Sequence, residues 1–457
     1  MARRRARLPA ELVEAQIEGL SHDGRGVARV DGKVIFVDNA LPGERVRLRY
    51  TTRSRQRDEG IAVAVDTAHP ERVVPRCGHF LVCGGCQLQH LAPEAQLAHK
   101  EHDLLDQLEH IGGVTPDQVL PALRGPVWGY RTKARLGVKH VAKKGRVLVG
   151  FRERRSPYVA DLQRCEVLDP RVGEALEALA QLIDTLEARA RIPQIEVAMD
   201  AERVCLVVRH LDPLSVGDTE RLADFARARG LAIALQPRGP DSVTFLEPPA
   251  LELRYALAAH GVEIAFRPTD FTQVNLAINA AMVEQAMALL DPGPSDHVLD
   301  LFCGLGNFSL PLARRGALVT GVEGDAAMVR QAQANAAHNG LDRVWFHAFD
   351  LSADPGVAAW ATPTRAFTKL LLDPPRSGAA ELLGFIGRSS FERVVYVSCQ
   401  PASLARDIGV LVNDHGFHLE RAGVMDMFPH TAHVESIALL TRRPGPRSTG
   451  HVPQSSR

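Results

Sequence analysis

Between residues 275 and 440, short apolar segments alternate with helical segments, and this alternation constrains the fold more than any other feature of the sequence. The helical segments carry apolar residues at helical spacing, as in Ala326–Asn339, which ends before Gly340. Strands that alternate with helices form a mostly parallel, doubly wound sheet, so we expect an α/β domain of this kind. The predicted strands are Val298–Leu301, Leu318–Val322, Val344–Ala348, Leu370–Leu372, Val394–Val397 and Ile437–Leu440.

A glycine-containing loop follows the first predicted strand, in the segment Val298–Phe308 with the sequence VLDLFCGLGNF. Glycines in such a loop let the backbone approach a ligand at the carboxyl end of the strand. Glu323 ends the next strand, where a carboxylate can accept hydrogen bonds from both hydroxyls of a ribose. Asp350 ends the third strand, and Asp373 opens a DPPR loop after the fourth. Together these features predict a nucleoside-binding pocket.

Two classes of nucleoside cofactor compete for this pocket. A dinucleotide-dependent oxidoreductase would need a glycine near Ser309 to complete the pattern GxGxxG, and the sequence lacks that glycine. A pyrophosphate also prefers a site with fewer carboxylates, whereas the sulfonium of S-adenosylmethionine tolerates acidic neighbours. The order and spacing of the acidic residues therefore favour S-adenosylmethionine.

Cys399 lies where a reactive thiolate would be stabilised. It follows the predicted strand Val394–Val397 and precedes a predicted helix that starts near Ala402. A helix N-terminus lowers the pKa of a thiol. Strand ends in this fold face the ligand crevice, which argues against the usual buried and inert cysteine. Cys205 and Cys303 lack this combination, and we expect them to be structural.

A thiolate is the group that a methyltransferase needs to act on carbon 5 of uracil, because this carbon is a poor nucleophile. Addition of the thiolate to carbon 6 gives an enolate whose carbon 5 can attack a sulfonium methyl group. The adduct must then lose the carbon-5 proton to a base. Glu435 enters the last predicted strand and is our candidate base, because a carboxylate beside an apolar run is unusual. His430 and His433 of the same loop are weaker candidates.

The N-terminal part of the chain predicts a small basic barrel. Short runs of β-forming residues in residues 11–68 are separated by glycine-containing and Pro-Gly turns. In one run Arg45, Arg47 and Arg49 alternate with apolar residues, so that the three guanidinium groups share one face. A second basic strand is predicted at Tyr130–Arg135. A five-stranded barrel with a basic face is typical of nucleic-acid binding.

Length and charge are consistent with a modular RNA-binding protein. Residues 1–160 hold 27 Lys and Arg against 18 Asp and Glu, whereas the remainder holds 27 against 36. The Arg-rich N-terminus lacks the apolar segment of a secretory signal, and no apolar run is long enough to span a bilayer, which predicts a cytoplasmic location. The 457 residues predict several domains: an OB-like barrel at 11–68, a β-rich central domain at 69–270 with a helix at Val172–Ala188, an α/β domain at 271–443 and a disordered tail at 444–457. We expect part of 93–124 to pack on the α/β domain.

Three cysteines are spaced closely enough to converge on one metal centre. Cys77, Cys83 and Cys86 form the pattern C-x5-C-x2-C in a loop that contains Gly84 and Gly85. A tetrahedral set of ligands needs a fourth thiol, and Cys165 is the best remaining candidate. Zinc and an iron–sulfur cluster both accept sulfur ligands, so the spacing alone leaves the choice between them open.

With these motifs in this order, the sequence resembles the bacterial RNA uracil-C5 methyltransferases from about Glu11 to Arg442. More narrowly, it is similar to the members that modify uracil 1939 of 23S ribosomal RNA. The resemblance implies a TRAM barrel, a Rossmann-like S-adenosylmethionine-dependent domain, a [4Fe-4S] cluster, a 23S ribosomal RNA substrate and a monomeric enzyme. The barrel and the cysteine cluster together distinguish the sequence from the transfer-RNA members, which lack both.

The resemblance also implies a role for individual residues. Cys399 matches the nucleophile of these enzymes and Glu435 matches the base. The four cluster ligands match Cys77, Cys83, Cys86 and Cys165. The cofactor-binding positions match Gln273, Phe302, Asn307, Glu323, Asp350 and Asp373.

Two residues depart from the pattern of the resembled enzymes. Gln400 follows Cys399 where these enzymes usually have Asn, and Asp350 lies where some of them have Asn. Both replacements keep a polar group, so they affect fine geometry rather than the reaction. Three alternatives remain at this point: a transfer-RNA uracil-C5 methyltransferase, an amino-group methyltransferase suggested by the Asp-Pro-Pro at Asp373, and a non-catalytic RNA-binding redox sensor.

Overall fold

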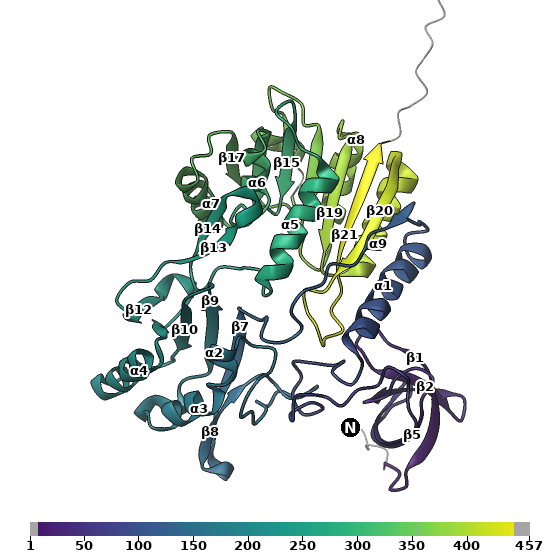
Figure 1. Ribbon diagram of the computed structural model, residues 1–457, viewed down its shortest axis with the longest axis vertical. Helices are drawn as coiled ribbons and strands as arrows, with labels where there is room; N and C mark the ends of the chain where they lie inside the picture. Colours follow the sequence, from purple (N-terminus) through teal and green to yellow (C-terminus); the bar gives the residue numbers. More distant parts are fainter. Residues whose placement is uncertain (1–7, 354, 443–457) are drawn as a thin grey trace, which may run out of the picture. The chain divides into compact units, whose positions relative to one another are not determined.

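The computed structural model describes residues 8–353 and 355–442, and the predicted tail at 444–457 lies outside the described residues (Figure 1). The chain forms two compact units, each built from several stretches of sequence. The first unit comprises Met1–Asp103, Ala122–Glu284 and Val424–Glu435, and the second comprises Leu104–Pro121, Gln285–Gly423 and Ser436–Arg457. The predicted boundaries near residues 68, 270 and 443 stay a prediction.

The first unit begins with the predicted barrel. Its strands close in the order β1-β2-β3-β5-β4, and only the β3–β5 pair is parallel among the strand pairs of the barrel that the structure describes. Asp31 and Gly32 join β2 to β3 with φ of 50° and 78°, the conformation of a two-residue hairpin turn. The bounds are β1 (Val13–Leu20), β2 (Gly26–Val30), β3 (Lys33–Asp38), β4 (Arg45–Arg53) and β5 (Asp58–Thr67).

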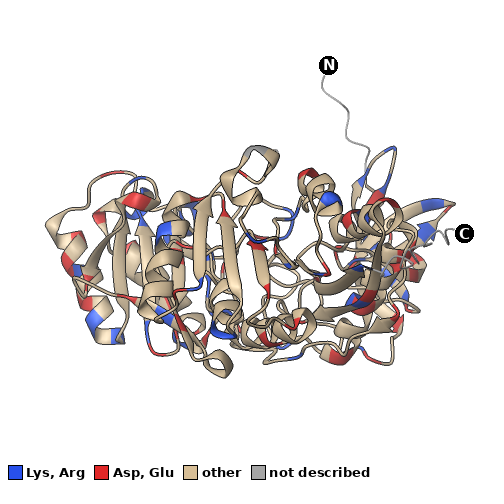
Figure 2. Cartoon of the chain, turned by 90° about the horizontal axis from the view of Figure 1, so that it is seen from above, with Lys and Arg blue, Asp and Glu red and all other residues tan. Residues whose placement is uncertain are grey.

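Alternation along β4 separates the core of the barrel from its charged surface. Val46, Leu48 and Tyr50 are buried in the barrel core, whereas the three arginines between them are exposed. Among the described residues, many Lys, Arg, Asp and Glu lie on loops and helices, and the long central strands carry few of them (Figure 2). The basic face predicted from the sequence is therefore present on β4.

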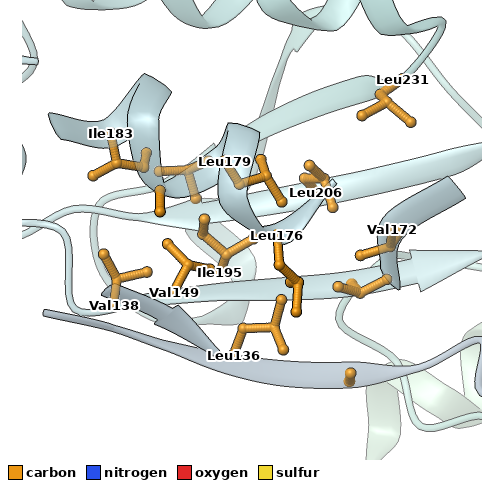
Figure 3. Packing of buried hydrophobic residues seen from close by; sticks show 14 of the residues in the cluster. Leu136, Val138, Val149, Val172, Leu176, Leu179, Ile183, Ile195, Leu206 and Leu231 are labelled. Atoms are coloured by element: carbon orange, nitrogen blue, oxygen red, sulfur yellow. The ribbon is translucent and has the colours of Figure 1, made fainter. Parts of the chain in front are cut away.

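The central part of the first unit is a six-stranded sheet in the order β12-β11-β10-β9-β7-β8, followed by the hairpin β13-β14. Leu176, Leu179 and Ile183 of α3 point onto the strands that carry Leu136 and Ile195, and together they form an apolar core (Figure 3). The bounds are β7 (Ala134–Val141), β8 (Arg146–Gly150), β9 (Gln194–Met199), β10 (Val204–Arg209), β11 (Ala232–Gln236), β12 (Thr244–Glu247), β13 (Leu253–Leu257), β14 (Val262–Phe266), α2 (Pro170–Gly173), α3 (Leu176–Asp184) and α4 (Val216–Arg229).

The helix predicted at Val172–Ala188 is divided in the structure into α2, α3 and the short turn Glu187–Ala190. The division follows from a close backbone contact at Gly173, where a Cβ atom would lie 2.3 Å from the carbonyl oxygen of Cys165. The backbone N–H of Cys165 donates to the Gly173 carbonyl oxygen at 2.9 Å. The interruption of the helix therefore fixes the segment that carries Cys165.

The second unit holds the predicted α/β sheet, in the order β17-β16-β15-β18-β19-β21-β20-β6. The first five strands are mutually parallel and β21 is antiparallel to β19. All six predicted strands are present, while β20 and β6 were not predicted. The bounds are β6 (Gln118–Val119), β15 (His297–Leu301), β16 (Leu318–Glu323), β17 (Val344–Ala348), β18 (Lys369–Leu372), β19 (Arg393–Ser398), β20 (Phe417–Met425), β21 (Glu435–Arg442), α5 (Leu276–Leu290), α6 (Ser309–Arg314), α7 (Ala326–His338), α8 (Leu383–Arg388) and α9 (Pro401–His415).

The strand order places a switch point between β15 and β18. From β15 the chain adds β16 and β17 on one side of the sheet and then returns to add β18 and β19 on the other. In doubly wound folds, ligands bind at the carboxyl ends of the strands beside such a switch point. No helix in the described ranges has both the length and the apolar character that crossing a membrane requires.

Candidate active site and cysteine pocket

The loop after β15 has an unusual backbone conformation. Phe302, Gly304 and Gly306 have φ of 64°, 55° and 92°, so three of its residues adopt left-handed conformations. A non-glycine residue in this region costs of order 1–3 kcal/mol and is concentrated at functional sites. At Gly306 a Cβ atom would also lie 3.0 Å from the side chain of Leu310. The loop is therefore shaped for close approach of its backbone to a ligand, and half-buried Asn307 follows in the same loop.

Glu323, the last residue of β16, is held in place by this loop. Its Oε2 accepts a hydrogen bond from the Gly304 N–H at 3.1 Å, and its Oε1 accepts one from the Asp325 N–H at 3.1 Å. A carboxylate has about four acceptor positions, so two backbone donors leave capacity for two hydroxyl groups. The side chain is half-buried. Glu323 thus has the position and acceptor capacity expected for recognition of a ribose.

Asp300 and Asp373 add two more carboxyl groups at the switch point. Asp300 is fully buried in β15, where burial, with smaller contributions from the charges of Asp373 and Glu323, raises its pKa to about 7. Burial likewise raises the pKa of Asp373, which follows β18, to about 7. Ser309 donates to Oδ2 of Asp300, whereas Oδ1 has no hydrogen-bond partner among the residues that the structure describes. An unsatisfied buried acceptor among acidic neighbours suits a positively charged ligand.

Sequence reasoning did not select Asp300, although it belongs to the VLDL segment that predicted the strand. The available signal was a carboxylate inside an otherwise apolar strand, because burying such a group is costly without a partner.

Asp350 was predicted to end the third strand but lies two residues beyond β17 and is exposed. Hydrogen bonds from the hydroxyl and the N–H of Ser352 to its Oδ1, at 2.7 and 3.0 Å, lower the pKa of Asp350.

Cys399 lies between the end of β19 and the start of α9, as the sequence predicted. The thiol is half-buried, and Pro401 occupies the first position of this 15-residue helix. Gln400 is the N-cap residue of α9, and its side chain forms no capping hydrogen bond within the described part of the chain. The positive end of the helix therefore adjoins the thiol, an arrangement that stabilises a thiolate.

Glu435 is the first residue of β21 and is buried. The next residue, Ser436, pairs with Ser398, and its hydroxyl donates to the Ser398 carbonyl oxygen at 3.1 Å. Cys399 follows Ser398 directly. The predicted nucleophile Cys399 is therefore the chain neighbour of Ser398, and the predicted base Glu435 is the chain neighbour of its hydrogen-bonded partner Ser436.

Gln273 lies in the loop that precedes α5 and is half-buried. The loop is anchored by Asn275, whose Oδ1 accepts from the Ile278 N–H at 3.3 Å and so caps the helix. Thr272 and Asn275 are buried, which orders the backbone on both sides of Gln273. This segment belongs to the first unit, so its role in cofactor binding stays a prediction.

The four predicted cysteine ligands line one pocket in the first unit. The N–H of Gly85 donates to Cys83 Sγ at 3.3 Å, and that of Gly84 donates to the Arg152 carbonyl oxygen at 2.8 Å, so both glycines fix the loop. The walls are mainly apolar. The lining residues include Cys77, Cys83, Cys86, Cys165, Phe80, Phe151, Leu162 and Val167.

Burial raises the pKa of all four thiols in this pocket, to about 11 for Cys83 and about 12 for Cys86. Free thiols in such a place stay protonated, and only a bound cation would favour four thiolates together. Across the residues that the structure describes, no group of three or more His, Cys, Asp or Glu side chains is arranged so that it could hold a metal ion. The pocket thus gathers the four predicted ligands, but the described side chains are not arranged as a metal site.

Comparison with known proteins identifies the family. The model of the tRNA (Uracil-5-)-methyltransferase family matches residues 93–443. The chain belongs to this family. A TRAM domain model matches residues 7–52, so the N-terminal barrel of this methyltransferase is a TRAM domain. The resemblance inferred from the sequence is confirmed, together with the barrel.

The methyltransferase has full-length relatives among curated proteins. A relative from Alkalilimnicola ehrlichii is 55% identical over 443 residues, which cover 97% of this chain and 99% of the relative. A relative from Methylococcus capsulatus is 53% identical over 440 residues, which cover 96% of this chain and 99% of the relative. Both are named 23S rRNA (uracil(1939)-C(5))-methyltransferase RlmD.

A solved structure shows the same fold. The crystal structure of Pyrococcus abyssi tRNA (uracil-54, C5)-methyltransferase in complex with S-adenosyl-L-homocysteine matches with a TM-score of 0.71 and 24% identity. The match covers 94% of this chain and 99% of that chain. The methyltransferase fold predicted for the α/β sheet is therefore confirmed.

Proposed function

We propose that this methyltransferase transfers the methyl group of S-adenosylmethionine to carbon 5 of uracil 1939 in 23S ribosomal RNA. The relatives that carry this name are 53–55% identical over nearly the whole chain. The observation that carries the proposal is the position of Cys399, between a strand end and a helix N-terminus in the same sheet as the acidic switch point. An oxidoreductase or an amino-group methyltransferase has no use for a thiol there.

The proposed reaction uses Cys399, which follows β19, and Glu435, the first residue of β21. The Cys399 thiolate adds to carbon 6 of the uracil, which forms a C–S bond and moves the electron pair of the C5–C6 double bond into an enolate. S-adenosylmethionine supplies the methyl group that carbon 5 takes up. Glu435 then accepts the carbon-5 proton, the electrons of the broken C–H bond restore the C5–C6 double bond, and the C–S bond breaks to release Cys399.

The acidic residues at the switch point would bind the cofactor. Glu323 would accept hydrogen bonds from the ribose hydroxyls, because its carboxylate is held by two backbone donors. When ionised, Asp300 and Asp373 would place negative charge near a cofactor that carries a positive sulfonium and amino group. We assign the remaining contacts to Gln273, Phe302, Asn307 and Asp350, as the family resemblance implies.

The TRAM barrel would hold the RNA. The exposed Arg45, Arg47 and Arg49 on β4 present guanidinium groups to phosphates. The target uracil must leave its stack to reach Cys399, because the faces of a stacked base are covered. A substrate that is ribosomal RNA is also the reason to expect a cytoplasmic enzyme, and we expect it to act as a monomer.

We further propose that Cys77, Cys83, Cys86 and Cys165 hold a [4Fe-4S] cluster. Four cysteine thiolates are the ligand set of such a cluster, and all four of these cysteines line one pocket. The family resemblance favours the cluster over zinc, which accepts the same ligands.

The direct test is to incubate the protein with methyl-labelled S-adenosylmethionine and unmodified 23S RNA under anaerobic conditions. Nuclease digestion and mass spectrometry should find the label in 5-methyluridine at position 1939. Label on an exocyclic amino group would favour an amino-group methyltransferase. Label in transfer RNA alone would move the protein to the other branch of the family. RNA binding that depends on the cluster, with no label transferred to either RNA, would favour the redox sensor.

A further inference from the structure

Helix α1 (Pro93–His110) buries two polar side chains on one face. Gln96 and Lys100 are four residues apart and each is only 1% exposed. A fully buried lysine is rare, because removing an ammonium group from water is costly without a partner. The contacts of Lys100 are therefore informative about why the residue is there.

Both side chains form hydrogen bonds with the segment that leads to Glu435. Lys100 Nζ donates to Asp426 Oδ1 at 2.8 Å and to the Phe428 carbonyl oxygen at 3.0 Å. Gln96 Oε1 accepts from the His430 N–H at 2.8 Å, and its Nε2 lies 3.1 Å from His430 Nδ1. Residues 426–435, which we call the base segment, are thus held by several hydrogen bonds to side chains of α1.

The rest of the base segment is fixed from other elements of the first unit. The Tyr130 hydroxyl donates to the Pro429 carbonyl oxygen at 3.0 Å. The N–H groups of Gln87 and Leu88 both donate to the His430 carbonyl oxygen at 2.9 Å. His430 has a φ of 66°, a left-handed conformation that persists only where the surroundings hold it.

Burial and the neighbouring charges have opposite effects on the pKa of Lys100. Burial lowers the pKa of Lys100, while the charges of Asp426 and Glu435 raise it. Burial, with a smaller contribution from the Lys100 charge, lowers the pKa of His430 to about 4, so this imidazole is neutral near pH 7. Lys100 is therefore a cation that interacts electrostatically with both carboxylates of the base segment, and Glu435 is only 5% exposed.

We infer that Lys100 is a positioning residue for Glu435: it fixes the base segment through Asp426 and Phe428 and stabilises the ionised carboxylate that removes the carbon-5 proton. The inference rests on the proposed function, because it assumes that Glu435 is the base. Addition of Cys399 and methyl transfer precede proton removal, so they do not require Lys100. Loss of Lys100 should therefore slow release of the RNA more than methyl transfer.

The test is a single-turnover reaction of the holoenzyme with unmodified 23S RNA and methyl-labelled S-adenosylmethionine. Aliquots are denatured and separated by electrophoresis, so that labelled RNA and labelled protein–RNA adduct are counted separately. For Lys100→Met we expect methyl transfer within a few-fold of wild type and release slowed at least roughly tenfold, with labelled adduct accumulating. Lys100→Arg, which keeps the charge, should restore most of the release rate.

A buried lysine elsewhere provides a matched control. Lys369 is 8% exposed and donates to Asp296 Oδ2 at 2.9 Å and to the Asp291 carbonyl oxygen, the same kinds of partner as Lys100 has. Lys369→Met should lower thermal stability without accumulation of adduct. If Lys100→Met does not fold, Lys100→Gln, which keeps a donor but no charge, carries the same expectation.

The outcomes separate the inference from the proposed function. Glu435→Gln should accumulate labelled adduct, and its failure to do so would overturn the role of Glu435 itself. Adduct in Glu435→Gln with normal release in Lys100→Met would overturn the inference alone. Equal loss of methyl transfer and release in a folded Lys100→Met protein would also overturn it, because that result indicates a general structural role.

Discussion

Asp300 and Asp373 both have a pKa of about 7, although an exposed aspartate titrates near 4. Such a shift disfavours the ionised protein, and a binding site for a cation is a physical reason to retain it. Asp300 has an unsatisfied oxygen among the described residues and lies beside Glu323, whose carboxylate is fixed by backbone donors. The three groups are best understood as one acidic site at the switch point of the sheet.

The raised pKa values predict how stability depends on pH. A carboxyl group whose pKa is near 7 in the folded state and near 4 in the unfolded state binds its proton more tightly when folded. It stabilises the folded protein fully below pH ~4, and this contribution is lost as the pH rises through about 7, by at most ~1.4 kcal/mol per pH unit for each group. Asp300→Asn removes one such group.

Thermal melts of the cofactor-free protein between pH 5 and pH 8 check this expectation. The stability of Asp300→Asn relative to wild type should increase across this range, because only wild type loses the contribution. A difference between the two proteins that stays constant with pH would contradict the assignment of a pKa near 7 to Asp300.

At the scale of elements, strand β4 combines a structural and a binding role. Its apolar residues fill the barrel core, and its alternate residues Arg45, Arg47 and Arg49 are exposed. The period of two along a strand made this division predictable from the sequence alone. The helix at Val172–Ala188 was less predictable, because its interruption depends on the contact between Gly173 and Cys165, which only the folded chain brings together.

Replacing the three arginines of β4 by alanine should weaken RNA binding and reduce its salt dependence. Each phosphate contact to single-stranded RNA contributes about 0.7 to the slope of log K against log salt, so the slope should fall by roughly 2. Filter binding from 50 to 300 mM salt measures the slope. Alanines at exposed Arg221, Arg227 and Arg229 of α4 form the control, and an equal change there would refute a specific role for β4.

The cysteine pocket is a second element-scale feature with a testable consequence. Cys86→Ala should lose most of the bound iron, lower the melting temperature and remove the visible absorbance of the cluster. Cys205 is also buried but does not line the pocket, so Cys205→Ala should keep its iron. Iron and acid-labile sulfide analysis of anaerobically purified proteins gives the answer. Zinc in place of iron and sulfide in wild type would contradict the cluster.

At the scale of the whole molecule, the sequence predicted the order of the parts better than their connections. The barrel, the six strands of the α/β sheet and the position of Cys399 follow from local periodicity and from glycine placement. The role of α1 was not predictable, because Lys100 meets Asp426 across more than 300 residues of sequence. Asp300 was missed for a related reason. Its role in the acidic site depends on its proximity to Glu323 and Asp373, which only the strand order creates.

In the proposed reaction, Cys399 forms a covalent bond to the uracil during methylation. The most direct measurement is anaerobic incubation with S-adenosylmethionine and 5-fluorouracil-substituted 23S RNA, followed by denaturing electrophoresis of wild type and Cys399→Ala. Fluorine on carbon 5 cannot leave as a proton does, so the adduct should be trapped. We expect a denaturation-stable protein–RNA band in wild type that maps to position 1939 and is absent from Cys399→Ala. The same band in Cys399→Ala, or methylation of unsubstituted RNA by that variant at the wild-type rate, would contradict it.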